Sequence, residues 1–173
     1  LNIRININEI KDNNIVVFPN GNWLTNKVYY NSQKGEYMSL KDFSTYLADA
    51  WVSSENPNQD ANCDIDMLIS WFQQADKKTL MVTEDYKVYT SLPDELNIYR
   101  GVALGREPHG LSWTADLEKA KWFAHRFDRG DKQGYIETAI VKKEDVLAYF
   151  NTRDEDELVV NVMNLKIEVV TEK

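Results

Sequence analysis

Two glutamates stand one residue apart in the segment RDEDELVV, where a run of acids leads into an apolar stretch near the end of the chain. The pair is Glu155 and Glu157, with Asp156 between them. Residues i and i+2 of a β-strand point to the same face, so a strand that begins early enough places both carboxylates on one side. Two carboxylates placed so close together raise each other's pKa. Such a pair is tolerated when it faces water, and also when it holds a ligand or a developing positive charge.

A second candidate for chemistry is the motif YRG, Tyr99-Arg100-Gly101, at the end of an apolar strand. The guanidinium of Arg100 offers a planar fork for a phosphate or a carboxylate. Gly101 lets the backbone approach a ligand closely, because it has no Cβ. Taken alone, the motif is more typical of a surface arginine before a bulge.

The third candidate is SWT, Ser112-Trp113-Thr114, which precedes an amphipathic segment. In a strand the two hydroxyls point one way and the indole the other, so the hydroxyls can hold a neighbouring acid by hydrogen bonds. The alternative is a helix N-cap at Thr114 or Asp116, preceded by a core tryptophan.

In this order, with strands and a helix between them, the three motifs resemble mono-ADP-ribosyltransferases of the arginine–serine–glutamate class, the group of cholera toxin and related clostridial toxins. That signature has an arginine on the first core strand, Ser-x-Ser/Thr on the second and a glutamate leading the fifth. The Glu-x-Glu form is similar to Glu155-Asp156-Glu157. The resemblance covers about the last half of the chain. The sequence there is also similar to short bacterial and phage-encoded, toxin-like members. Trp113 departs from it, since the best-known form has a hydroxyl residue there.

The resemblance implies an α+β fold, an ADP-ribosyltransferase-like split β-sandwich with flanking helices and an N-terminal β/helical lobe. It implies that NAD binds in the cleft as co-substrate and that ADP-ribose is transferred to a target protein, with arginine favoured as acceptor. Glu157 would stabilise the positive charge that develops on the ribose, and Glu155 would activate the acceptor. Arg100 would complete the catalytic set.

The same resemblance assigns the cofactor-binding residues. Arg100 would pair with the phosphates or ribose, and the backbone at Gly101 would meet the nicotinamide carboxamide. Ser112 and Thr114 would brace the cleft and orient Glu157. The ring of Trp113, Trp122 or Phe123 would stack on the ligand, although an aromatic on a helical stripe is more often a core residue.

Two other functions fit the same residues. One is an NAD glycohydrolase, with water as the acceptor. The other is a non-catalytic member that binds or inhibits another protein, a role for which the net charge of −8 suits a basic partner.

The composition limits which partners, compartments and cofactors are expected for this chain. The chain has 173 residues, 43% of them hydrophobic, and its acidic balance disfavours nucleic acid as a partner. No apolar run approaches membrane-spanning length, which predicts no membrane partner. The single cysteine, Cys63, favours a reducing compartment, so the cytoplasm is expected. With only two histidines beside it, no metal site is expected.

Periodicity predicts the elements that must position these residues. They form an N-terminal strand and helix lobe over 1–91, packed on the core over 92–173 that the resemblance implies binds NAD, and the two are expected to make one compact domain. In the lobe, the patterns predict strands over 1–10, 14–22 and 26–31 and helices over 39–54, capped by Ser39, and 65–78. In the core, they predict strands over 96–104, 110–116, 134–143, 157–162 and 165–173, a helix over 117–127, and a short helix or turn over 144–150. The expected inner residues of the helices are Leu40, Phe43, Tyr46, Leu47, Trp51, then Ile65, Leu68, Trp71, Phe72, then Leu117, Ala120, Phe123, Ala124 and Phe127.

Overall fold

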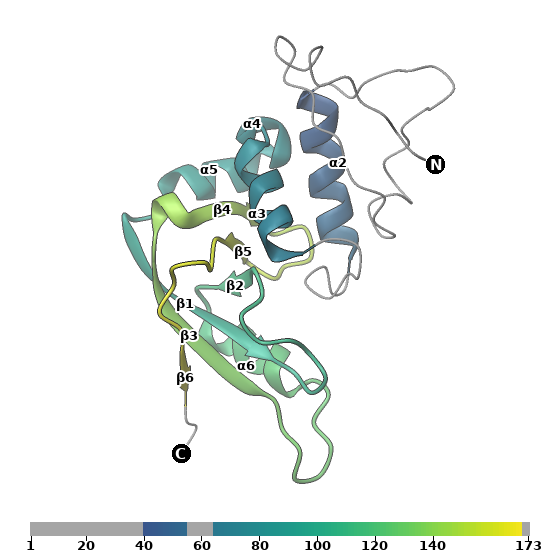
Figure 1. Cartoon of the computed structure of the whole chain (residues 1–173), viewed down its shortest axis with the longest axis vertical. Helices are drawn as coiled ribbons and strands as arrows, with labels where there is room; N and C mark the ends of the chain where they lie inside the picture. Colours follow the sequence, from purple (N-terminus) through teal and green to yellow (C-terminus); the bar gives the residue numbers. More distant parts are fainter. Residues whose placement is uncertain (1–39, 55–63, 171–173) are drawn as a thin grey trace, which may run out of the picture. The chain divides into compact units, whose positions relative to one another are not determined.

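The computed structural model describes residues 40–54 and 64–170. The chain divides into two units, Leu1–Leu80 and Met81–Lys173, and each is described by itself (Figure 1). The strands predicted over 1–31 and the cap predicted at Ser39 lie outside the described residues.

The described part of the first unit is helical. It contains α2 (Leu40–Ser53), α3 (Ile65–Gln74) and the short α4 (Lys77–Leu80). Asp64 caps α3, because its carboxylate accepts the backbone N–H of Met67 at 2.8 Å. The inner faces of α2 and α3 meet through Trp51 and Phe72, whose rings lie edge to face with centroids 5.0 Å apart. Tyr46, predicted to face inward, is 40% exposed.

The second unit is built around an antiparallel sheet that has six strands in the described residues, in the order β4-β5-β2-β1-β3-β6. Its elements in chain order are α5 (Thr83–Ser91), β1 (Glu95–Val102), β2 (Ser112–Thr114), α6 (Leu117–His125), β3 (Tyr135–Lys142), the 3₁₀ turn η3 (Lys143–Asp145), β4 (Val146–Phe150), β5 (Glu157–Val160) and β6 (Glu168–Val170). Helices in both units and this sheet confirm the predicted α+β class.

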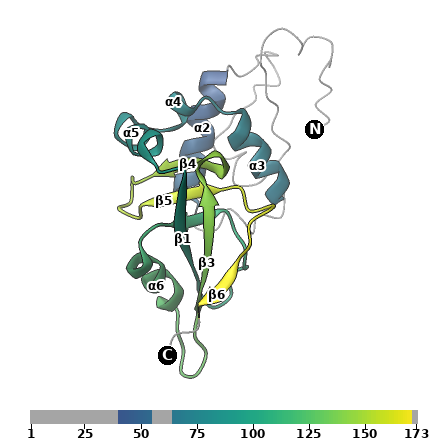
Figure 2. The ribbon, with the colours of Figure 1, turned by 90° about the vertical axis from the view of Figure 1, so that its left-hand side faces the viewer.

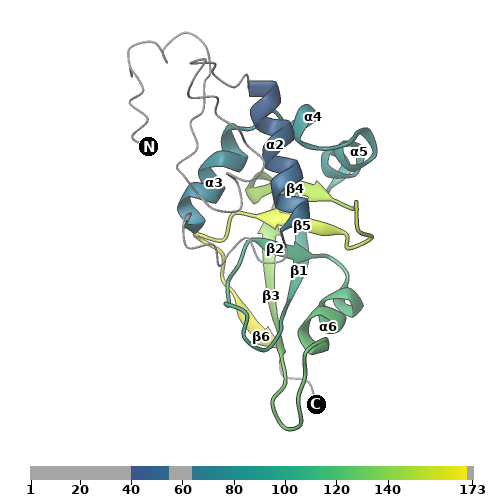
Figure 3. The same cartoon turned by 90° about the vertical axis from the view of Figure 1, so that its right-hand side faces the viewer.

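The sheet is narrow at its middle. β1 and β3 pair from Glu95↔Lys142 to Val102↔Tyr135, whereas β1 and β2 share, among the described residues, the single pair Tyr99↔Thr114. The sheet therefore consists of two three-stranded halves joined at one point. Figures 2 and 3 show β4 and β5 running across the direction of β1 and β3.

Helix α6 packs closely against β1 and β3 (Figure 3). A Cβ placed on Gly101 would clash with the backbone of Ala120 and Ala124 and would lie 2.8 Å from the Cβ of Phe123. The contact is completed by a buried cluster in which Ala120 and Ala124 pack against Ile136. Gly101 is therefore required for α6 to sit on the strand.

The segment 144–150, predicted as a short helix or turn, is instead η3 followed by strand β4. All five residues of β4 are buried. An apolar run without alternation is typical of a strand covered on both faces, and length alone does not separate it from a buried helical turn.

Helix α5 was not predicted, because TEDYKVYTS has only a weak apolar stripe. It contacts β4, so the second unit begins ahead of the boundary expected at Leu92. The helix predicted over 117–127 ends at His125, so Phe127 lies beyond α6 and is 45% exposed, contrary to its predicted inward position. Among the described residues, no helix has both the length and the apolarity needed to cross a membrane.

Candidate functional site

Arg100 spans the point at which β1 and β2 separate. Its Nη1 donates to the carbonyl oxygen of Ser112 at 2.8 Å, and its Nη2 to that of Glu107 at 3.3 Å. Its Nε lies 3.9 Å from Glu137 Oε2 and has no hydrogen-bond partner among the described residues. The side chain is only 10% exposed. The guanidinium thus binds carbonyl groups where the strands no longer bind each other.

The charge of Arg100 is balanced by two carboxylates. Burial lowers the pKa of the guanidinium, while Glu137 and, after it, Glu157 act to raise it. Glu157 is therefore within electrostatic reach of Arg100, although the two residues are distant in sequence. Arginine stays protonated despite such burial, because its ordinary pKa is so high.

Glu137 is a buried acid that none of the sequence motifs indicated. It lies on β3 directly opposite Arg100 in the ladder and is fully buried. His109, which has a left-handed φ of 55°, donates its backbone N–H to both carboxylate oxygens at 3.3 and 3.1 Å. Its Nδ1 lies 2.9 Å from Glu137 Oε1. Glu137 therefore ties the β1–β2 loop to the sheet; its one sequence signal is an acid inside the apolar strand YIETAIV.

The SWT motif forms β2, and its three residues have different surroundings. Trp113 is 2% exposed and its Nε1 donates to the carbonyl oxygen of Gly110 at 2.8 Å, so it is a core residue and not an exposed stacking surface. The hydroxyl of Thr114 accepts the backbone N–H of Asp116 at 3.1 Å. Asp116 caps α6 by accepting the N–H groups of Glu118 and Lys119. The capping alternative for this motif is therefore confirmed at Asp116.

Glu157 is the first residue of β5 and is 7% exposed. It pairs directly with Thr114 of β2 on one side and with Phe150 of β4 on the other. Directly opposed residues of an antiparallel pair project to the same face, so Thr114 and Glu157 share one face of the sheet. The structure thus brings the second and third motifs together, beside the strand that carries Arg100.

Glu155 does not share the strand of Glu157, contrary to the expectation that alternation places both on one face. β5 begins at Glu157, and Asp156 ahead of it has a left-handed φ of 47°. Glu155 lies in the β4–β5 loop, where its carboxylate accepts Nη2 of Arg153 at 2.8 Å and its side chain is 25% exposed. The two glutamates are held by different structures, one by a ladder and one by a loop.

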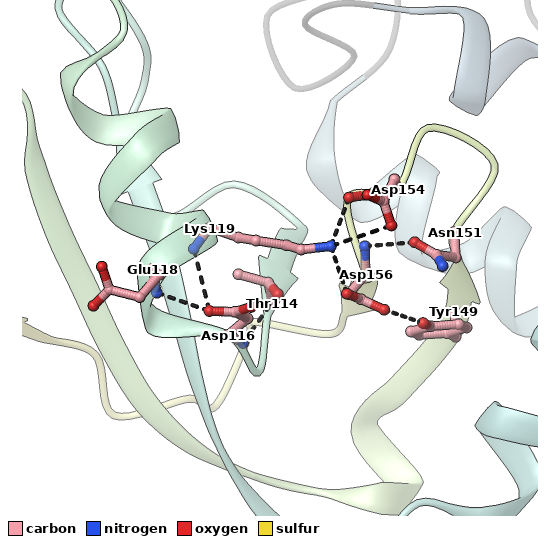
Figure 4. A network of polar contacts seen from close by, with 8 residues as sticks. All are labelled: Thr114, Asp116, Glu118, Lys119, Tyr149, Asn151, Asp154 and Asp156. Carbon is pink, nitrogen blue, oxygen red and sulfur yellow. Dashed lines mark hydrogen bonds and ion pairs between the residues drawn. The ribbon is translucent and has the colours of Figure 1, made fainter.

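That loop, residues 151–156, is anchored by side chains from three elements, most of them drawn in Figure 4. Lys119 of α6 donates to Asp156 Oδ2 and to the carbonyl oxygen of Asp154, both at 2.6 Å. Tyr149 of β4 donates to Asp156 Oδ1 at 2.5 Å. At the start of the loop, the backbone N–H of Asn151 donates to Asp85 of α5 at 3.2 Å.

The anchors shift the pKa values of the groups they join. The hydrogen bond from Lys119, followed by that from Tyr149, lowers the pKa of Asp156. The same bond raises the pKa of Lys119. Burial, followed by the bond to Asp156, raises the pKa of Tyr149. At neutral pH the contact therefore joins an ammonium, a carboxylate and a neutral phenol. Motif spacing did not indicate this network, because Lys119 and Asp156 belong to segments far apart in the chain.

Gly101 and Phe123, both predicted to bind the cofactor, lie at the contact between β1 and α6. The absence of a side chain at Gly101 is explained by α6, which packs on it. The ring of Phe123 lies edge to face with Trp122, with centroids 5.0 Å apart, and the guanidinium of Arg126 lies 5.2 Å from its centre. Their roles toward a ligand stay predictions.

The residue types at the narrow point of the sheet fit a ligand that carries phosphate and sugar hydroxyls. Arg100 supplies a cation with one buried N–H, on Nε, that has no hydrogen-bond partner among the described residues. Glu157 supplies a nearly buried carboxylate suited to a developing positive charge. Among the described residues, no group of three or more histidine, cysteine, aspartate or glutamate side chains could hold a metal ion.

Comparison with known proteins adds no relative: no protein-family model, no curated protein and no solved structure matches this chain.

Proposed function

We propose that this chain is an NAD-dependent mono-ADP-ribosyltransferase that moves ADP-ribose to a protein side chain, with arginine favoured, and releases nicotinamide. One observation carries the proposal: the first two motifs, on consecutive strands, lie next to the third, which is distant in sequence, where the sheet narrows. Arg100 binds the backbone of Ser112 at 2.8 Å, and Thr114 of the same short strand pairs with Glu157. The narrow junction between two three-stranded halves also supports an ADP-ribosyltransferase-like split sandwich as the fold.

Glu157 is assigned the main catalytic role. Cleavage of the bond between ribose and nicotinamide develops positive charge on the sugar. A carboxylate fixed at the start of a strand stabilises that charge more in the transition state than in the ground state. Its low exposure strengthens the interaction, because little water is present to screen it.

Arg100 is assigned to the phosphates or ribose of NAD. Its bond to Glu107, at 3.3 Å, is the longer of its two hydrogen bonds and is the one that a phosphate oxygen would replace. Glu137 would keep the guanidinium in place during that exchange, because it faces Arg100 across the ladder.

Glu155 is assigned to the acceptor. It lies in a loop and is partly exposed, so a protein side chain can reach it. The acidic chain suits a target with a basic surface around its acceptor arginine. The proposed place of action is the cytoplasm, as expected of a bacterial or phage effector.

The test compares wild type with Glu157→Gln, and uses Glu168→Gln as a matched control. Glu168 lies on β6, is 62% exposed in its side chain and pairs with Lys166. Purified protein is incubated with NAD and a bacterial lysate, and released nicotinamide and ADP-ribose bound to protein are measured together.

The proposal expects both products from wild type and the Glu168→Gln control, and a loss of roughly 100- to 1000-fold in Glu157→Gln. Release without protein modification would make the chain an NAD glycohydrolase. If wild type yields neither product, the enzyme proposal is refuted. The non-catalytic function of binding another protein is then the alternative that stands.

A further inference from the structure

We propose that Lys119 is a positioning residue that holds Glu155 at the acceptor and so decides whether ADP-ribose goes to protein or to water. The inference rests on the proposed function and adds to it a residue outside the three motifs. Lys119 touches neither glutamate in any of its described contacts; it acts through Asp154 and Asp156, which flank Glu155.

The contact geometry supports this role. One ammonium from α6 binds on both sides of Glu155, at the carbonyl oxygen of Asp154 and at the carboxylate of Asp156, each at 2.6 Å (Figure 4). The other oxygen of Asp156 is held by Tyr149, and its backbone N–H donates to the Asn151 side chain at 3.0 Å. Asp156 is therefore fixed from three directions. We call the set Lys119, Asp156, Tyr149 and Asn151 the loop clamp.

The backbone of the loop gives a reason for the clamp. Asp154 and Asp156 both have left-handed φ angles, 58° and 47°. Aspartate adopts this conformation more readily than most residues, but it still costs energy and persists only where the surroundings enforce it. The two residues enclose Glu155, so loss of the clamp relaxes the segment that aims this carboxylate.

Glu157 should be insensitive to the same change. Its backbone belongs to β5 and is paired on both sides, with Thr114 and with Phe150. Loss of Lys119 therefore separates the two glutamates functionally: the charge-stabilising one stays and the acceptor-activating one moves.

The chemistry predicts what this separation does. The bond between ribose C1 and the nicotinamide nitrogen breaks, and nicotinamide leaves with the bonding electrons. A new bond forms from C1 to the acceptor nitrogen or to a water oxygen, and the displaced proton passes to Glu155 or to solvent. Without a correctly placed Glu155, the guanidino group loses its base and water takes its place.

The experiment measures both products for wild type, Lys119→Met, Lys119→Arg and Lys121→Met. Methionine keeps an unbranched helix-forming side chain without the charge. Lys121 is the matched control, because it lies on the same helix and pairs at 2.6 Å with the exposed Glu118. Labelled NAD incorporated into lysate protein gives transfer, and nicotinamide release gives total cleavage.

A second readout needs no activity. Arg153 lies inside the clamped loop and is a trypsin site. The rate of cleavage after Arg153, followed by intact mass in the absence of NAD, reports how often the loop opens.

The expected result is a roughly 10- to 100-fold fall in transfer for Lys119→Met while release stays within about threefold of wild type. Cleavage after Arg153 rises about tenfold. Lys119→Arg restores part of both effects, and Lys121→Met matches wild type. If transfer and release fall together, or if cleavage is unchanged, the positioning role is wrong even with an active wild type. An inactive wild type refutes the proposed function itself; faster cleavage in Lys119→Met would then leave the clamp as a loop brace only.

Discussion

Arg100 and Lys119 both bridge separate elements of the candidate site, but they do so in opposite surroundings. Arg100 is 10% exposed and binds backbone carbonyls of neighbouring segments beside the buried Glu137. Lys119 is 24% exposed and binds a carboxylate that is itself 40% exposed. Burial lowers the pKa of Arg100, whereas the bond to Asp156 raises that of Lys119.

The difference distinguishes a residue that stabilises the fold, Arg100, from one that orients a side chain, Lys119. A buried cation that balances buried acids cannot be removed without leaving those acids uncompensated. A partly exposed cation can be removed at little cost to stability, because water replaces it. Arg100 should therefore be needed for the sheet itself, and Lys119 for the position of one loop.

The largest expected effect is that of Arg100→Ala. It leaves Glu137, with a side-chain exposure of 1%, without its charge partner. The free energy of unfolding should fall by about 3 to 5 kcal/mol. Urea denaturation measures this, and adding Glu137→Gln should recover part of the loss. A fall below about 1 kcal/mol would remove the contrast with Lys119.

Gly101→Ala should have the next largest effect. Gly101 follows Arg100 on β1 and lies against α6, the helix that carries Lys119. Its Cβ would clash with the backbone of Ala120 and Ala124, so the helix must move away from β1. The free energy of unfolding should fall by about 2 to 3 kcal/mol. The displaced helix should also carry Lys119 away from Asp156 and speed cleavage after Arg153.

Gly105→Ala is the control for that change. Gly105 has a φ of 78° but open space around its Cβ, so only backbone strain is added, about 1 kcal/mol. Equal losses at the two glycines, or unchanged cleavage after Arg153 in Gly101→Ala, would mean that α6 is not seated as described.

The smallest effect is a pH dependence at Asp156. Its pKa is lowered in the folded state, so its stabilising contribution is present above the ordinary value of 3.8 and is lost as the pH falls through the lowered pKa. The difference in unfolding free energy between wild type and Asp156→Asn should therefore be constant above that value and shrink below it. Urea titrations at several acidic pH values test this; a difference that grows on acidification would contradict the ion pair with Lys119.

Much of this unit follows from sequence patterns, and the exceptions have physical reasons. The strands around YRG, SWT and ELVV and the helix capped by Asp116 are all present, because their signals are local. Strand β4 was misassigned because a run buried on both faces has no period to recognise.

The candidate site was predicted unevenly for a similar reason. Glu157 stands at the start of β5, but Glu155 lies outside the strand because two left-handed aspartates, Asp154 and Asp156, interrupt the alternation. The partners Glu137 and Lys119 carry no motif, since each acts through a contact that only the folded chain creates.

The main proposal is that Glu157, held where the sheet narrows, stabilises the positive charge that develops on the ribose as NAD is cleaved. The most direct measurement is the rate of nicotinamide release from NAD by purified wild type, Glu157→Gln and Glu155→Gln. We expect release by wild type, a loss of roughly 100-fold or more in Glu157→Gln, and a much smaller loss in Glu155→Gln. Equal release by wild type and Glu157→Gln, or none by wild type, would contradict it.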